Sequence, residues 1–220
     1  MTHTRNVLVL GATGLVGRAL VNLLLREPTI LSVVALVRRT VALPRDPKLS
    51  VHLTDFEHLD KHTDVFRVDQ VFCALGTTMR LAGTQDRFRR VDHDYPLQAA
   101  QLSRAGGATH YLLVSAIGAD PASRIFYNRV KGETEADITR VGFASLTIAR
   151  PSLLVGPRSE RRIGERLGHV LGLLAPPSYR PIAAVDVAAA LTLAARESRL
   201  GDRILTSREM RGASLRLSKS

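Results

Sequence analysis

The stretch Val7-Leu-Val-Leu-Gly-Ala-Thr-Gly-Leu-Val-Gly17 decides the fold, because an apolar run leads directly into three glycines spaced three residues apart. The run before Gly11 is typical of a strand, and residues 15–26 repeat apolar side chains at helical spacing. Gly11 permits a tight turn, Gly14 lets the backbone approach a pyrophosphate, and Gly17 allows close packing of helix on strand. The stretch therefore predicts a dinucleotide site, and a turn that merely connects two elements is the alternative.

Strands and helices alternate along the rest of the chain. We expect further strands at 31–37, 51–53, 68–74, 110–115, 144–149 and 203–206, and helices from a capping box at 54–57 and over 85–104, 123–141, 159–173 and 186–197. Nearly continuous apolar strands that alternate with helices indicate an α/β fold, a doubly wound parallel sheet covered on both faces. The length of 220 residues predicts a single domain, in which 151–211 form a small substrate-side region and 212–220 a frayed tail.

Composition excludes several classes of protein. The net charge is +11, yet the basic residues are spread along the chain without the aromatic partners of a base-stacking platform, so we expect no specific nucleic-acid binding. No export signal and no apolar run long enough for a bilayer are apparent, which predicts a cytoplasmic location without membrane contact. Cys73, the single cysteine, is expected in the core. His58 and His62 share a helical face but lack a third ligand, so we expect no metal site.

Arg38 follows the second predicted strand, where a carboxylate would otherwise accept hydrogen bonds from the adenosine ribose. An arginine cannot accept them, but it can pair with a 2′-phosphate. This position favours NADP(H) over NAD(H), with Arg39 either assisting or lying on the surface. Asp55, after the third strand, is expected to meet the adenine amino group or, equally, to start the next helix.

Tyr127 and Lys131 stand four residues apart, so on a helix they share a face. An ammonium group beside a phenol favours the phenolate, which makes the tyrosine a usable acid or base. Ser115, at the end of the fifth strand, would reach the same crevice and donate a hydrogen bond to a substrate oxygen. The alternative pairs Lys131 with Glu135 and Arg129 with Glu133 in surface bridges.

The ordered motifs resemble the short-chain dehydrogenase/reductase superfamily, in its atypical branch of Tat-interacting-protein-like NAD(P)H-binding oxidoreductases. They are Gly11-Ala-Thr-Gly-Leu-Val-Gly17, Cys73-Ala-Leu-Gly-Thr-Thr78, Val91-Asp-His-Asp-Tyr95, Val114-Ser-Ala-Ile-Gly-Ala119, Phe126-Tyr-Asn-Arg-Val-Lys-Gly-Glu-Thr-Glu135 and Ala149-Arg-Pro-Ser-Leu-Leu-Val-Gly-Pro157. The resemblance implies a Rossmann-like fold and makes Ser115, Tyr127 and Lys131 the catalytic residues. It also implies cofactor contacts from Thr13, Leu15, Val16, Leu75, Gly76, Thr77, Pro151 and Leu154, besides the glycines and Lys131.

The expected function is an NADP(H)-dependent oxidoreductase that moves hydride between nicotinamide and a carbonyl or alcohol. Asp92 departs from the family pattern, because many relatives have an asparagine there that completes a catalytic tetrad. This departure and the short carboxyl-terminal region leave two alternatives open. One is a non-catalytic NADP(H) sensor with a protein partner, and the other is a sugar-nucleotide epimerase or dehydratase that retains NAD(P).

Overall fold

The predicted alternation builds a seven-stranded sheet in the computed structural model, which describes residues 4–156 and 179–218. The strands are β1 (Arg5–Leu10), β2 (Ile30–Val37), β3 (Leu49–Leu53), β4 (Gln70–Cys73), β5 (His110–Val114), β6 (Ser145–Arg150) and β9 (Gly201–Thr206). Their order is β3-β2-β1-β4-β5-β6-β9, and every neighbouring pair is parallel. The doubly wound sheet is confirmed. Two short strands, β7 (Leu154–Val155) and β8 (Ile182–Ala183), pair beside it.

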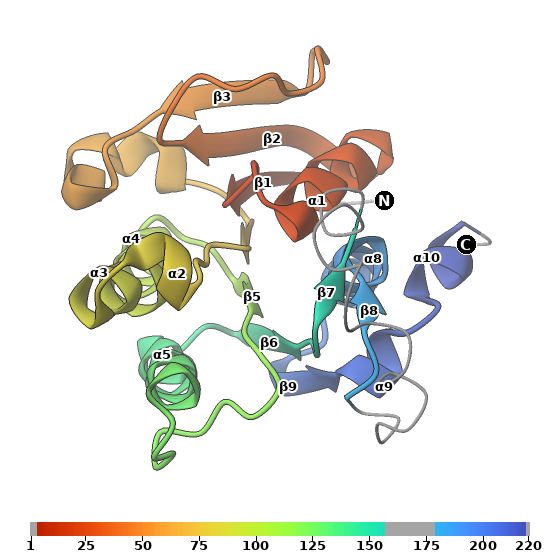
Figure 1. The fold of residues 1–220 in the computed structure, drawn as a ribbon. Helices are drawn as coiled ribbons and strands as arrows, with labels where there is room; N and C mark the ends of the chain where they lie inside the picture. Colours follow the sequence, from red (N-terminus) through yellow and green to blue (C-terminus); the bar gives the residue numbers. More distant parts are fainter. Residues whose placement is uncertain (1–3, 157–178, 219–220) are drawn as a thin grey trace.

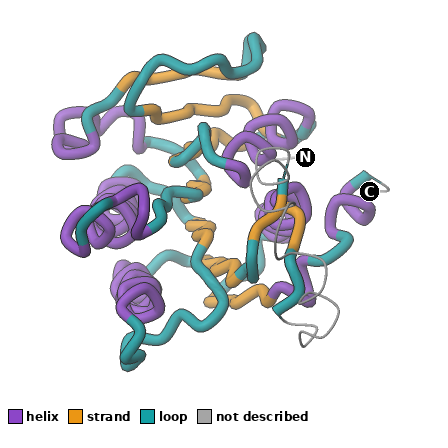
Figure 2. The backbone as a smooth tube through the Cα atoms, viewed as in Figure 1, coloured by secondary structure: helices purple, strands orange, loops and turns teal. Residues whose placement is uncertain are grey.

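Helices cover both faces of the sheet, as Figures 1 and 2 show. One face carries α1 (Leu15–Arg26), α8 (Ala184–Glu197) and α10 (Ala213–Leu217), and the other carries η1 (Phe56–Phe66), α4 (Tyr95–Ala105) and α5 (Phe126–Val141). Shorter segments are α2 (Met79–Ala82), α3 (Gln85–Arg89), η2 (Arg90–Asp94) and α9 (Ser207–Met210). The apolar side chains of β1 divide between the two layers, because Val7 and Val9 join the α1 core while Leu8 and Leu10 join the α4 core.

Several elements differ from the sequence prediction. The helix expected over 85–104 is divided into α3, the π-helical segment η2 and α4, and Pro96 lies in the first turn of α4. Helix α5 begins at Phe126, since residues 120–125 form turns instead of helix. The cap of η1 is Asp55 and not Thr54. The helix predicted over 159–173 lies outside the described residues.

The carboxyl-terminal region was predicted least well. Residues 213–217 form helix α10 instead of a frayed tail, and Ala213 is fully buried. Ser214 explains why this segment is ordered, because its backbone N–H and its hydroxyl both donate to Asp186 Oδ1 on α8, at 3.1 and 2.5 Å. Asp186 therefore binds α10 and is not the cap of its own helix, a position that Ala183 takes.

The strand order reverses direction between β1 and β4. From β1 the chain builds outward to β2 and β3, and from β4 it builds the opposite way to β5, β6 and β9. The connection that follows β1 and the connection that follows β4 lead in opposite directions along the sheet. A crevice is therefore expected between them, at the carboxyl ends of β1 and β4. The glycine turn after β1 and the loop after β4 meet there.

Candidate functional site

The turn between β1 and α1 has no room for side chains. Gly11 has a φ of +80°, and a Cβ there would lie 2.3 Å from the carbonyl oxygen of Ala74. A Cβ on Gly17 would lie 2.0 Å from the carbonyl oxygen of Gly11. The turn is therefore pressed against both β4 and its own helix, and larger residues at these two positions are excluded.

The first turn of α1 is available to an anion. Its cap is Gly14, which has no side chain to accept from the N–H groups of the following residues. Arg18 donates through Nε to the carbonyl of Thr13 at 3.1 Å and braces the turn. Val16 is buried in the core and Leu15 half-buried, so these two residues offer mainly backbone N–H groups. Helix-terminal N–H groups arranged in this way favour phosphate.

A hollow, here called the inner hollow, runs from the glycine turn toward the end of β2. It is lined by Gly11, Thr13, Gly14, Leu36, Val37, Arg38, Phe56, Ala74, Leu75, Gly76, Val91 and Tyr95. A second, outer hollow adjoins it and shares Arg38, Phe56 and Tyr95 while adding Asp55. The predicted residues Arg38, Asp55, Leu75 and Gly76 are thus brought together. Arg39 is exposed and is not among the lining residues of these two hollows.

Asp55 also has the structural role that its sequence position allowed. Its carboxylate accepts from the backbone N–H of Glu57 at 3.0 Å as the cap of η1. The Phe56 and Tyr95 rings lie 5.6 Å apart between centroids, and the Tyr95 hydroxyl donates to Glu57 Oε1 at 2.6 Å. Burial and this carboxylate raise the pKa of Tyr95 to about 12. The two rings form a rigid apolar wall beside Arg38.

Lys131 is held inside the protein by a buried ion pair. Its Nζ lies 2.7 Å from Asp92 Oδ1, and the side chains are 8% and 1% exposed. The second oxygen of Asp92 accepts from the backbone N–H of Thr77 at 2.8 Å. A Cβ added to Gly76 would lie 3.4 Å from the same carboxylate. The loop after β4 and the α5 helix are therefore joined through Asp92.

Tyr127 lies one helical turn before Lys131 and packs against Phe88, with ring centroids 5.5 Å apart. Burial raises the pKa of Tyr127, the charge of Lys131 lowers it, and Asp92 raises it, so the net direction is upward. Ser115 follows β5 and is 5% exposed. Its Oγ has no hydrogen-bond partner among the described residues, which leaves a buried hydroxyl available to a ligand.

The surface bridges considered as an alternative for α5 are absent between the residues named. Lys131 pairs with Asp92, while Glu135 accepts from Arg150 Nε at 3.1 Å. Glu133 pairs with Arg89, and Arg129 donates to the carbonyl of Ser123 at 3.0 Å. Lys131 is therefore paired inside the protein and does not face the solvent.

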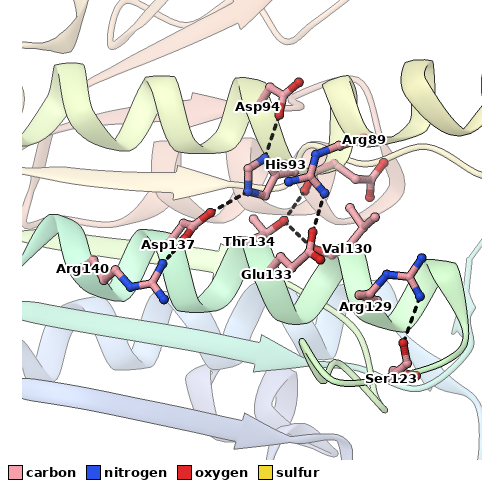
Figure 3. A network of polar contacts seen from close by, with 11 residues as sticks. Arg89, His93, Asp94, Ser123, Arg129, Val130, Glu133, Thr134, Asp137 and Arg140 are labelled. Atoms are coloured by element: carbon pink, nitrogen blue, oxygen red, sulfur yellow. Dashed lines mark hydrogen bonds and ion pairs between the residues drawn. The ribbon is translucent and has the colours of Figure 1, made fainter.

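A network of polar contacts along α5 fixes the helix against η2 (Figure 3). Thr134 donates to the carbonyl of Asp92 at 3.0 Å, and the ring nitrogens of His93 lie 2.7 Å from Asp94 and 2.8 Å from Asp137. Gly132 adds a close approach, because a Cβ there would lie 2.2 Å from the backbone of Asp120. These contacts give Tyr127 and Lys131 a defined position.

The loop that carries Ser115 is joined to the segment after β6. The N–H groups of Ser115 and Ile117 donate to the carbonyls of Ala149 and Pro151, both at 2.8 Å. Pro151 is thereby placed beside the Ser115 loop. Leu154 lies on β7, half-buried against the α1 side of the core.

Comparison with known proteins now identifies the family. A family described as NAD(P)H-binding matches residues 11–197. Protein HTATIP2 of Rattus norvegicus is 38% identical over 188 residues, which cover 84% of this chain and 77% of the relative. The chain belongs to the NAD(P)H-binding family. Its resemblance to the short-chain dehydrogenase/reductase superfamily is confirmed.

Solved structures agree on the Rossmann-like fold of this NAD(P)H-binding protein. MoeE5 in complex with UDP-glucuronic acid and NAD superposes with a TM-score of 0.72 at 21% identity, over 91% of this chain and 75% of that chain. A UDP-glucose 4-epimerase from Thermotoga maritima gives 0.69 at 16%, over 91% and 76%. At these identities the likeness concerns the fold alone.

One expectation from the sequence is overturned. Protein FMP52, mitochondrial, of Saccharomyces cerevisiae is 34% identical over 80% of this chain and 77% of its own, and a Candida albicans relative with the same name is 32% identical. These relatives are named mitochondrial, in conflict with the predicted cytoplasmic location. Among the described residues, no helix is long and apolar enough to cross a membrane.

The sequence did not reveal every residue that lines the inner hollow. Phe56, Val91 and Tyr95 line the inner hollow but carry no motif of their own. The sequence signal for Phe56 is its position as the aromatic neighbour of Asp55. Gly132, directly after Lys131, was a detectable signal, since a glycine inside a helix usually has a packing reason.

Proposed function

We propose that this protein is an NADP(H)-dependent oxidoreductase that transfers hydride between nicotinamide and a carbonyl or alcohol. The observation that carries the proposal is the buried Ser115 hydroxyl directly after β5, which has no partner among the described residues. The charge of Lys131 acts on the phenol of Tyr127 one helical turn away, and in this proposal the three groups meet one substrate. A buried hydroxyl without a partner costs stability, and a site that hydrogen-bonds a substrate oxygen explains its presence.

The crevice fits a dinucleotide. The glycine turn leaves space where side chains would block a pyrophosphate, and the N–H groups of the first turn of α1 favour its charge. Phe56 and Tyr95 offer an apolar wall for an adenine, and Lys131 is placed to donate to the nicotinamide ribose. A bound nicotinamide supplies the hydride.

The chain's own groups handle the proton and the substrate oxygen. Ser115 donates a hydrogen bond to the carbonyl oxygen and orients it. Tyr127 gives its phenolic proton to that oxygen as the carbonyl carbon receives the hydride. Lys131 stabilises the phenolate that remains. The reverse sequence oxidises an alcohol, with the phenolate as base.

Turnover is tested by following NADPH loss with a panel of aldehydes and ketones. Tyr127→Phe should lower kcat by roughly 10²- to 10⁴-fold, because the proton donor is gone, while NADPH still raises the melting temperature. The matched control is Tyr179→Phe, an exposed tyrosine that should leave kcat unchanged. Equal activity in Tyr127→Phe and wild type would refute the assignment.

The preference for NADP(H) rests on Arg38. Replacing Arg38 with alanine should weaken NADPH binding by roughly 10- to 100-fold, or about 1.5–3 kcal/mol, through loss of charge-assisted hydrogen bonds, and leave NADH binding unchanged. Arg39→Ala removes the neighbouring exposed charge as a control. A wild-type protein that NADH stabilises more than NADPH, at matched concentration, would contradict this preference.

A second candidate is a protein that binds NADP(H) as a sensor without useful turnover. The observation that favours it is the Asp92–Lys131 ion pair, since a lysine whose charge is offset activates a phenol less strongly. Cofactor binding with no NADPH loss across the carbonyl panel would select the sensor.

A further inference from the structure

Asp92 is buried and makes its polar contacts with residues that are distant in the sequence. It lies in the π-helical segment η2 and is 1% exposed, yet all three of its oxygens have partners. The carboxylate contacts Lys131 Nζ at 2.7 Å and the N–H of Thr77 at 2.8 Å, and the backbone carbonyl accepts from Thr134 at 3.0 Å. Asp92 thus links the loop after β4 to the helix that carries Tyr127.

The charges around Tyr127 come from few groups. Helix α5 supplies Lys131 and η2 supplies Asp92. Cys73, at the end of β4, acts on Lys131, while the neighbour from α3 is the uncharged Phe88. Burial, the largest single effect, lowers the pKa of Lys131, but Asp92, Tyr127 and Cys73 together raise it above its ordinary value, so the ammonium keeps its proton. Its charge is nevertheless offset by a carboxylate at contact distance.

We propose that Asp92 is a positioning residue that holds Lys131 and offsets its charge, so that Tyr127 keeps its proton at neutral pH and acts as the proton donor in carbonyl reduction. This inference rests on the proposed function. Asparagine at this position would accept the same N–H of Thr77 without the negative charge. The aspartate therefore sets the protonation state of the phenol as well as the geometry.

The reductive step balances with the groups named. The phenolic O–H bond of Tyr127 breaks and an O–H bond forms at the substrate, whose carbonyl carbon gains the hydride of a reduced nicotinamide. The products are an alcohol, the oxidised cofactor and a phenolate. Tyr127 then regains a proton from water. Alcohol oxidation would need the phenolate at the outset, so we expect it only at alkaline pH.

A titration of tyrosine absorbance tests the inference without any turnover. The chain has four tyrosines and no tryptophan, so subtracting the Tyr127→Phe spectrum isolates one phenol. In wild type we expect little Tyr127 phenolate at pH ~10, the ordinary midpoint. In Asp92→Asn the midpoint should fall by about one pH unit or more, because one opposing charge is gone. Circular dichroism at each pH shows that the protein remains folded.

Two further variants keep this test decisive. Glu133→Gln removes a carboxylate of the same helix that pairs with Arg89, and it should leave the Tyr127 midpoint unchanged. Lys131→Met removes the positive charge and should shift the midpoint upward. If Asp92→Asn does not fold, the upward shift in Lys131→Met still has to appear. A Tyr127 midpoint in folded Asp92→Asn or in Lys131→Met that equals the wild-type midpoint would overturn the inference.

The pH profile of carbonyl reduction separates charge from structure. In Asp92→Asn the alkaline fall of kcat/KM should move to lower pH by the same interval as the phenol midpoint. A role limited to packing would lower kcat/KM equally at every pH and leave the inflection in place, which would also overturn the inference. If wild type shows no turnover, the proposed function fails, whereas the absorbance titration still decides the role of Asp92.

Discussion

Buried polar atoms without a hydrogen-bond partner occur at both ends of the strands of the central sheet. We call the carboxyl-terminal ends of the strands the carboxyl edge and their amino-terminal ends the amino edge. At the carboxyl edge, Ser115 has a buried hydroxyl without a partner among the described residues. At the amino edge, Gln70 Oε1 and His110 Nδ1 are buried and equally lack a partner there. A buried polar atom therefore does not by itself mark a site.

What separates the edges is the structure around these atoms. Gln70 and His110 begin neighbouring strands, and Gln70 Nε2 donates to the carbonyl of Ala195 at the end of α8, at 3.0 Å. Arg5 donates to the same carbonyl at 2.8 Å. At the amino edge, side chains thus satisfy a carbonyl at the end of α8. At the carboxyl edge lie the start of α1 and the loops that follow the strands. Direction along the strand, and not burial, distinguishes a structural cluster from a functional one.

The largest effect is expected from Gly17→Ala at the carboxyl edge. The new Cβ would meet the Gly11 carbonyl at 2.0 Å, so the strand and helix must separate. We expect a loss of unfolding free energy on the order of 4 kcal/mol and of NADPH binding. Gly14→Ala is the matched control, because its Cβ would meet the same oxygen only at 3.4 Å. It should fold within about 1 kcal/mol of wild type and bind NADPH weakly. Thermal unfolding with and without NADPH measures both.

If Gly14→Ala were as unstable as Gly17→Ala, the turn would be a folding element throughout. The comparison between the edges would then lose its basis, since the carboxyl edge would be as structural as the amino edge. Normal NADPH binding by Gly14→Ala would instead place the pyrophosphate elsewhere.

The second effect contrasts one hydroxyl at each edge. Ser115→Ala should lower kcat for carbonyl reduction by roughly 100-fold and leave stability within about 0.5 kcal/mol, because its Oγ bonds no described residue. Thr147→Val removes the hydroxyl that lies 2.9 Å from His110 Nε2. It should lower the unfolding free energy by about 1–2 kcal/mol and leave kcat unchanged. Steady-state rates and urea unfolding of both variants are the measurements.

A reversed result would be informative. Loss of stability in Ser115→Ala with normal kcat would make Ser115 a packing residue, and the proposed function would lose the observation that carries it.

The features that the sequence predicted are those that local rules determine. The glycine turn depends on backbone sterics within a few residues, and the shared face of Tyr127 and Lys131 depends on helical spacing alone. Both were predicted with the parallel sheet. The ends of helices were less predictable, since α5 begins at Phe126 only because residues 120–125 turn, and Asp120 lies against Gly132.

The features that escaped prediction depend on distant segments. The resemblance marked Asp92 as a departure, but its contacts with Lys131 and Thr77 arise from the packing of η2 between two other elements. The order of α10 likewise depends on Asp186 of α8, which lies 28 residues before its partner Ser214. Side-chain patterns along one segment contain no information about such partners.

The smallest effect concerns pH and the amino edge. Burial lowers the pKa of His110 to about 4, from an ordinary value of 6.5. Between these values the unfolded chain binds the proton that the folded protein excludes, so stability rises with pH. His110 should therefore cost nothing above pH ~6.5 and about 2 kcal/mol at pH ~5, with the loss complete below pH ~4. His110→Gln, which does not titrate, should make the unfolding free energy nearly independent of pH across this window, as urea unfolding at a series of pH values would measure.

The rise in melting temperature with NADPH should be the same in wild type and His110→Gln, because the amino edge does not meet the crevice. A pH dependence that persists in His110→Gln would assign it to other groups, and a changed NADPH response would show that the two edges are coupled.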